Sequence, residues 1–172
     1  MSTFAERIMR AAALDVNTYE EVEADTTATT QAMGVVVLSS IAQGIGVSTL
    51  EGGVGFFAGA IGALIVWFIW AFIVYIIGTK VLPEPQTHSD LGELLRTTGF
   101  SASPGLLRVL GILPLIGGLV MFATNIWMLI AMIIAVRQAL DYQSTGRAVG
   151  VCLIGWFASM AILVMLLGGR IA

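Results

Sequence analysis

Charged side chains are scarce in this sequence. Asp, Glu, Lys and Arg make up 11% of its 172 residues, against about 25% in an ordinary soluble domain. Four long stretches contain no charged residue at all: 26–50, 52–79, 109–136 and 148–169. Each stretch exceeds the roughly 20 apolar residues that a helix needs to cross a hydrocarbon core about 30 Å thick. The sequence therefore excludes an ordinary soluble domain and indicates a polytopic helical membrane domain.

Cysteine and histidine are almost absent, since the chain has one of each, Cys152 and His88. A single cysteine excludes an intrachain disulfide and a cysteine metal cluster, and a single loop histidine is usually solvated. The sequence also lacks an HExxH pair, a GxSxG elbow, a CxxC pair and a Gly-rich phosphate loop. These absences predict a protein with no enzymatic activity, no metal and no other cofactor.

Basic residues are too few and too scattered to neutralise the phosphates of nucleic acid, so we expect no nucleic-acid partner. The net charge of −3 arises in residues 1–25, which hold six acids and two bases, whereas the remainder holds five acids and six bases. The acids of residues 1–25 fit either a solvated helix face or a docking patch for a partner.

The same N-terminal segment is amphipathic. Apolar residues recur at helical spacing from Phe4 to Val16, opposite the charged ones, which predicts a helix lying on the membrane surface. Thr18 stands three residues before Glu21, the spacing of a capping box, and predicts a helix that starts at Tyr19 and leads into the first span. We therefore divide the chain into a cytoplasmic N-terminal segment, residues 1–25, and a membrane domain, residues 26–172.

The first two predicted spans differ in composition. The first, about residues 27–46, contains several Thr, Ser and Gln residues and should face other helices more than lipid. In the second, about residues 54–78, Gly55 and Gly59 have the GxxxG spacing that lets a neighbouring helix approach closely. An aromatic stripe over residues 67–75 follows, and it suits helix packing better than the binding of a pigment or quinone.

Two prolines end the second span and begin an elbow that is re-entrant or interfacial. Asp90 and Glu93 have the spacing of a capping box for a short amphipathic helix that Gly99 would close. Ser103 is then predicted to cap a new helix with Pro104 at its first position.

The third charge-free stretch is too long for one untilted crossing, because its 28 residues would make about 42 Å of helix. Pro114 and the glycine pair after it offer a break, which gives a third span at about residues 103–113 and a fourth at about residues 118–137. The third span is short, so it has to carry Arg108 near the interface or thin the membrane locally, and a crossing of only half of the membrane is the alternative.

Lys and Arg concentrate on the cytoplasmic side of membrane proteins. With five crossings and a cytoplasmic N-terminus, seven bases lie inside and only Arg170 lies outside, whereas four crossings give six against two. The base count thus predicts five crossings with the C-terminus outside.

Polar residues near the later spans are the remaining candidates for function. Asn125, deep in the fourth span, suits an interhelical hydrogen bond or the lining of a substrate path. No charged residue falls in the middle of a predicted span, which argues against pumping of protons or ions. Arg137, Asp141 and Arg147 lie around the entry to the last span, about residues 146–168, and the first two have the spacing of an ion pair. This cluster is predicted to bind lipid phosphate or a partner's acid, or to anchor the helix ends.

Several segments, taken in order, resemble the Yip family of polytopic membrane proteins (Ypt-interacting proteins), particularly its short bacterial members. They are Thr18–Val22, Gly99–Pro104, Ala135–Asp141 and Ser144–Ala148. The second segment is similar to the family's GYxxxP pattern, with Phe100 in place of the tyrosine. The resemblance implies five crossings and a cytosolic N-terminus. Eukaryotic members bind prenylated Rab GTPases and carry a DLYGP motif that this sequence lacks, so Rab binding is not expected.

The sequence as a whole predicts an all-α, five-span helical bundle in a membrane, and by the resemblance a bacterial cytoplasmic membrane. Its expected partners are the lipid bilayer and either further copies of itself or other membrane proteins. Our leading hypothesis is a non-enzymatic protein that acts by association, as an oligomer or as a subunit or scaffold of a membrane complex. The alternatives are a small channel or transporter and, less well supported, a protein that shapes or binds lipid.

Overall fold

The computed structural model describes residues 2–51 and 56–168, and over these residues the fold consists of helices joined by turns and loops, without strands. This confirms the predicted all-α class. The elements in chain order are α1 (Phe4–Ala12), α2 (Val16–Ala24), α3 (Ala28–Glu51), α4 (Phe56–Ile76), the π-helix η1 (Ile77–Val81), α5 (Leu91–Phe100), the 3-10 helix η2 (Ser103–Ile112), α6 (Gly117–Ala139) and α7 (Thr145–Gly168).

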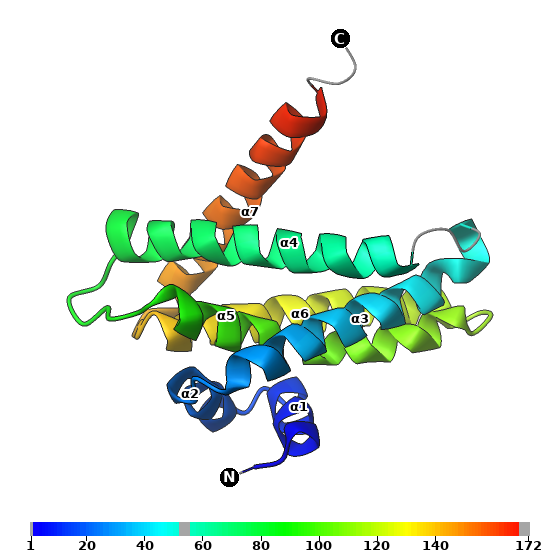
Figure 1. Cartoon of the computed structure of the whole chain (residues 1–172), viewed down its shortest axis with the longest axis horizontal. Helices are drawn as coiled ribbons and strands as arrows, with labels where there is room; N and C mark the ends of the chain where they lie inside the picture. Colours follow the sequence, from blue (N-terminus) through cyan, green and yellow to red (C-terminus); the bar gives the residue numbers. More distant parts are fainter. Residues whose placement is uncertain (1, 52–55, 169–172) are drawn as a thin grey trace.

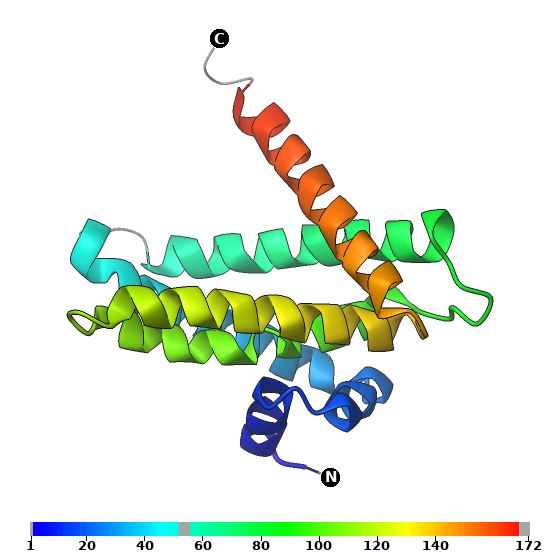
Figure 2. The same ribbon diagram turned by 180° about the vertical axis from the view of Figure 1, so that it is seen from behind.

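The long helices α3, α4 and α6 run alongside one another as a bundle (Figure 1). The helices α5 and η2 follow each other in series beside α3 and α6, and a tight turn at their end leads back into α6 (Figure 2). The two short N-terminal helices lie together against one side of the bundle. Helix α7 starts in the bundle and then leaves it at a steep angle, so that its C-terminal end stands apart (Figures 1 and 2).

Four helices are long and apolar enough to cross a membrane, over residues Ala28–Gly46, Leu64–Val81, Gly117–Ala139 and Thr145–Ile162. They correspond to the first, second, fourth and fifth predicted spans, so the break at Pro114 is present. The prediction of five crossings is not confirmed in its detail, because the third segment is the 3-10 helix η2. Ten residues at about 2.0 Å each give about 20 Å, too short to cross without help from α5.

The N-terminal segment folds with boundaries that differ from the prediction. Helix α1 begins after a capping box between Thr3 and Glu6, and α2 begins after Asp15, which accepts from the backbone N–H of Asn17. The predicted cap at Thr18 is wrong: Thr18 lies inside α2, and its hydroxyl donates to Asp15. An aspartate three residues earlier is the stronger cap because it brings a full negative charge to the helix N-terminus.

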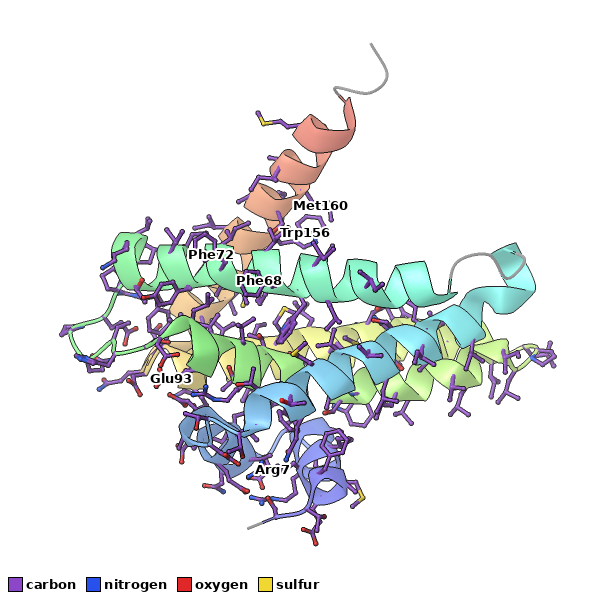
Figure 3. The ribbon with its side chains drawn as sticks, in the orientation of Figure 1. Arg7, Phe68, Phe72, Glu93, Trp156 and Met160 are labelled. Carbon is purple, nitrogen blue, oxygen red and sulfur yellow. The ribbon has the colours of Figure 1, made fainter. Side chains whose placement is uncertain are left out.

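A buried arginine joins this segment to the membrane domain. Arg7 of α1 is 3% exposed and pairs with Glu21 at 3.1 Å and with Asp25 at 2.7 Å. It also donates to Oε1 of Gln31, near the start of α3, at 3.0 Å. Phe4 packs edge-on against Phe100, with ring centroids 6.4 Å apart. The N-terminal helices are therefore folded onto the bundle, with Arg7 at the junction (Figure 3).

Two buried clusters form the core. One joins α2, α3, α5 and α6 around Tyr19, Val22, Val35 and Phe100. The other joins α4, α6 and α7 around Val74, Leu140, Tyr142 and Val151. Both clusters lie towards the end of the bundle that carries α2 and α5, which leaves the opposite end of α3, η2 and α6 to be held by a different kind of contact.

Candidate functional site

The 3-10 helix η2 lies in a groove between α3 and α6. A 3-10 helix has three residues per turn, so residues at i, i+3 and i+6 share one face. On η2 these are Gly105, Arg108 and Gly111. Each of the three contacts both α3 and α6. Along this face of η2, Arg108 therefore lies between two glycines.

The faces of α3 and α6 that contact η2 also have a long polar residue in the middle position. On α3 the residues that meet η2 are Ser39, Gln43 and Gly46, spaced by four and three positions, and on α6 they are Met121, Asn125 and Met128. Both sets follow the i, i+4, i+7 spacing of one helix face. The middle residues of the three sets, Gln43 of α3, Arg108 of η2 and Asn125 of α6, lie at one level and carry long polar side chains. We call these three residues the polar layer.

The small residues let the backbones approach closely. A Cβ atom on Gly105 would lie 2.9 Å from Sδ of Met128 and would collide with the hydroxyl of Ser39. A Cβ atom on Gly46 would collide with the carbonyl oxygen of Arg108. This is the way in which membrane helices gain van der Waals contact without a hydrophobic driving force.

Arg108 is the centre of the polar layer. Its Nη1 atom donates to Oε1 of Gln43 at 2.8 Å, and its Nη2 atom donates to Oδ1 of Asn125. Its Nε atom is buried and has no hydrogen-bond partner. Both partners are neutral amides, so they satisfy donors of the guanidinium but leave its charge unbalanced.

The layer lies well inside the helices. A rise of 1.5 Å per residue places Gln43 about 12 Å from the last residue of α3 and Asn125 about 12 Å from the first residue of α6. These two helix ends lie at the same end of the bundle (Figures 1 and 2). A charge at the centre of a membrane helix costs about 2.5–3.5 kcal/mol, so such residues mark functional sites by default.

The sequence missed this site. The sequence placed Arg108 near the interface and predicted no charge in the middle of a span, because each segment was considered separately. The spacing of Gly105, Arg108 and Gly111 at i, i+3 and i+6 could have indicated a shared face. Residues at this spacing share one face only in a 3-10 helix, and the sequence did not predict that helix type. Asn125 was chosen as a candidate, and the structure gives it Arg108 as a partner across two segments.

The junction of α5 and η2 holds the segment that resembles the GYxxxP pattern. A Cβ atom on Gly99 would lie 2.7 Å from Cβ of Ala32 and 3.1 Å from the ring of Trp67, so α5 meets α3 and α4 there. Pro104 is buried in the first turn of η2. The predicted cap at Ser103 is wrong: its hydroxyl is buried without a partner, and η2 has no side-chain cap. Ser103 already belongs to the 3-10 helix and cannot reach a free N–H.

Polar residues at the start of α7 and in the turn before it fasten the loop after η1. Arg147 donates from Nη1 to the carbonyl oxygen of Pro83 at 2.6 Å and lies 3.5 Å from Glu84. Glu84 also accepts the backbone N–H of Gln143 at 2.9 Å. The pKa of Glu84 is lowered, chiefly by this hydrogen bond and further by that from Gln86 and by the Arg147 charge. Tyr142 is 3% exposed, and its hydroxyl lies 2.9 Å from the Gly78 carbonyl oxygen and 2.7 Å from that of Leu82.

Arg137 and Asp141 do not pair, although their spacing allows it. Nε of Arg137 donates to the carbonyl oxygen of Tyr142 at 3.1 Å, and no ion pair between described residues includes Asp141. Asp141 has a positive φ of 53°, which turns the chain out of α6. The structure thus brings Arg147 into the loop contact, whereas Arg137 holds the turn that follows α6.

Gly55, one of the two GxxxG residues, lies outside the described residues. Gly59 belongs to α4.

Arg96 is a buried residue that the sequence did not single out. It is 5% exposed and donates to the carbonyl oxygens of Val22 and Glu23 at the end of α2, at 3.1 and 2.9 Å. A cation at a helix C-terminus satisfies free carbonyl groups and opposes the negative end of the helix dipole. Arg96 therefore ties α5 to α2.

A helical fold with four membrane-length helices, an arginine layer in the bundle and a folded polar segment against one side of it defines a polytopic integral membrane protein. The Yip1 domain matches residues 23–167, and the chain belongs to this family, as the resemblance predicted. The match includes the groove, the α5–η2 junction and the Arg147 contact. No curated protein and no solved structure matches the chain.

Proposed function

We propose that this protein acts without enzymatic activity, by associating with other membrane helices and first of all with a second copy of itself. The observation that carries the proposal is the unfinished packing of α7. Its first half is buried against α4 and α6 at Ala148, Val151 and Cys152. From Trp156 to Met165 no described residue is buried.

The second half of α7 stands away from α4 and leaves an open angle. Trp156 and Met160 project from α7 beside α4, which carries Phe68 and Phe72 (Figure 3). A pocket of about 360 Å³ lies between α6 and α7, with Trp70 of α4 in its wall, and is lined almost entirely by apolar side chains, among them Met132 and Trp156. A helix laid in this angle would contact α4 and α7 together, and packing contacts of this kind hold membrane helices together.

Association is tested by counting copies in liposomes at low protein density, by single-molecule photobleaching. We expect two or more copies for the unaltered chain and a shift to single copies for Trp156→Ala combined with Met160→Ala. The matched control is Leu119→Ala combined with Phe122→Ala, two apolar residues of α6 that are 69% and 64% exposed. Single copies of the unaltered chain, or the same shift in the control, would contradict the proposal.

The orientation is part of the proposal. We propose that α5 and η2 together make the third of five crossings, with the N-terminus cytoplasmic and the C-terminus outside, in a bacterial cytoplasmic membrane. Support comes from the base count and from the position of η2 between α3 and α6. A C-terminal tag that resists protease added from outside would overturn it.

A channel or transporter remains the second candidate, and the polar layer around Arg108 favours it. A charge held by neutral amides within the membrane domain is a feature of substrate paths. Liposomes containing the protein should then show flux of small anions that Arg108→Gln abolishes. Flux equal to that of empty liposomes would dispose of this candidate.

A further inference from the structure

The charge of Arg108 lacks a counter-ion in the described part of the chain. Its two hydrogen-bond acceptors are the amide oxygens of Gln43 and Asn125, and none of the ion pairs includes it. The buried Nε atom has a hydrogen to donate and no acceptor. In a medium of low dielectric constant, an arginine in this state requires an anion.

The two amides leave further donors around the charge. Arginine has donors only, so the oxygens of Gln43 and Asn125 must face it and their NH₂ groups must point elsewhere. Neither NH₂ group has an acceptor among the described residues, and both side chains are exposed on the bundle surface. The layer therefore presents one guanidinium and two amide groups to an acceptor of hydrogen bonds.

A second copy of the chain does not supply this anion. Six of the eleven acids lie in residues 6–25, in and around the short helices against one side of the bundle (Figure 1), where Arg7 and Arg10 pair with Asp15, Glu21 and Asp25. Four more, Glu84, Asp90, Glu93 and Asp141, lie towards the end of the bundle opposite the first residue of α6 (Figure 1). The eleventh, Glu51, is eight positions beyond Gln43, which is about 12 Å along α3. A copy in the same orientation carries its carboxylates at these same depths.

We propose that Arg108, Gln43 and Asn125 form a binding site for the phosphate group of a membrane phospholipid. Phosphate is the abundant anion of a bilayer, and its oxygens accept several hydrogen bonds from a guanidinium at once. The layer is about 12 Å below the helix ends, so the headgroup is drawn inward beside η2 and the membrane is thinned there. The short 3-10 helix, which spans less of the membrane than its neighbours, fits this thinning. The site is separate from the α4–α7 angle and does not depend on association.

The test uses the whole chain in detergent with added phosphatidylglycerol, and native mass spectrometry measures the lipid retained. We expect Arg108→Gln, which keeps a hydrogen-bonding side chain without the charge, to weaken retention at least tenfold. Arg108→Lys keeps the charge without the planar fork and should lie between. Arg10→Gln is the control, because it removes an arginine outside the layer whose charge is already balanced by Asp15 and Glu21, and it should leave retention unchanged. Equal retention by Arg108→Gln, or an equal loss in the control, overturns the proposal.

Two further probes identify the source of the phosphate. A galactosyl diacylglycerol has the same tails without phosphate and should be retained at least tenfold less by the unaltered chain; equal retention overturns the site. Inorganic phosphate should not displace the lipid at millimolar concentration; displacement would assign the site to soluble phosphate and overturn the lipid. Should Arg108→Gln fail to fold, Gln43→Leu combined with Asn125→Leu removes the amide donors and is expected to weaken retention severalfold, and unchanged retention would count against the site.

Discussion

Nη1 of Arg108 lies 2.8 Å from Oε1 of Gln43, although 65 positions separate the two residues in the chain. The contact joins η2 to α3, and the neighbouring contact to Asn125 joins η2 to α6. One side chain thus links three segments, at a depth where unpaired polar groups are costly. The layer is both a structural joint and the candidate site of the protein.

Removal of one partner should show how strongly this layer holds the bundle. We expect Asn125→Leu to lower the free energy of unfolding by about 1–3 kcal/mol, because a donor of Arg108 is left without its acceptor. Arg108→Met added to Asn125→Leu should recover most of the loss, since the polar group is then gone as well. Unfolding in mixed detergent micelles measures both.

Gln138→Leu is the matched control for this experiment. Gln138 is an amide of the same helix and donates to Glu20 at 3.0 Å in an exposed position. Its loss should cost well under 1 kcal/mol, as exposed polar pairs do. If both substitutions had equal effects, the layer would contribute no more than a surface contact.

The close approach at Gly99 makes a second prediction. A methyl group there meets Ala32 at 2.7 Å and Trp67 at 3.1 Å, so Gly99→Ala should destabilise the protein by about 1–3 kcal/mol through overpacking. Gly118, in α6, has nothing within 4 Å of an added Cβ atom, and Gly118→Ala should be neutral or stabilising by up to about 1 kcal/mol. Midpoint temperatures in one detergent compare them, and a stable Gly99→Ala variant would contradict the packing described here.

Tyr142 fastens the end of α6 to the end of α4. Burial raises the pKa of its hydroxyl to about 12, so it stays protonated and able to donate at neutral pH. Tyr142→Phe keeps the ring and should cost about 0.5–1.5 kcal/mol, the net contribution of one hydrogen bond. Tyr75→Phe is the control, because no described residue bonds to that hydroxyl. Equal midpoints for the two variants would show that the contact contributes nothing.

The N-terminal segment should respond to pH through Glu23. Burial, reinforced by the charges of Glu93, Asp141 and Glu20 and opposed by Arg96, raises the pKa of Glu23 from 4.5 to about 7. The folded chain holds this proton more tightly than the unfolded chain. The stabilisation is therefore complete below about pH 4.5 and is lost as the pH rises to about 7.

Thermal midpoints between pH 4.5 and 7 test this, with Glu23→Gln expected to flatten the decline. Glu6→Gln is the control, since the pKa of Glu6 is lowered, chiefly by its hydrogen bonds with Thr3, and its contribution is lost only at more acid pH. Asp25 also acts outside the window, because hydrogen bonds from Thr27 and Arg7 lower its pKa to about 2. An unchanged slope in Glu23→Gln would remove Glu23 as the cause.

Local signals in the sequence predicted the elements well where one segment carries the whole cause. The capping box of Asp90 and Glu93 is present at the start of α5, and Pro114 breaks the third stretch. The predictions failed where more than one residue can cap a helix or where the helix type differs. Asp15 rather than Thr18 caps α2, and Ser103 is part of the 3-10 helix η2, which lies between α3 and α6.

The sequence by itself determined the membrane class, the helical fold, four of the segments that can cross and the family. The class, the fold and the segments follow from the four charge-free stretches, because a helix satisfies its own backbone polar groups in lipid. The family follows from the four short segments that resemble it. Tertiary structure alone decided that Arg108 shares a layer with Gln43 and Asn125, that Arg7 and Arg96 are buried under the N-terminal helices, and that α7 leaves the bundle. Each of these depends on which helix faces which neighbour, and in lipid that choice is made by small residues and single polar contacts rather than by hydrophobicity. A scarcity of charge thus gives the class, and the positions of three arginines give the structure its particular form.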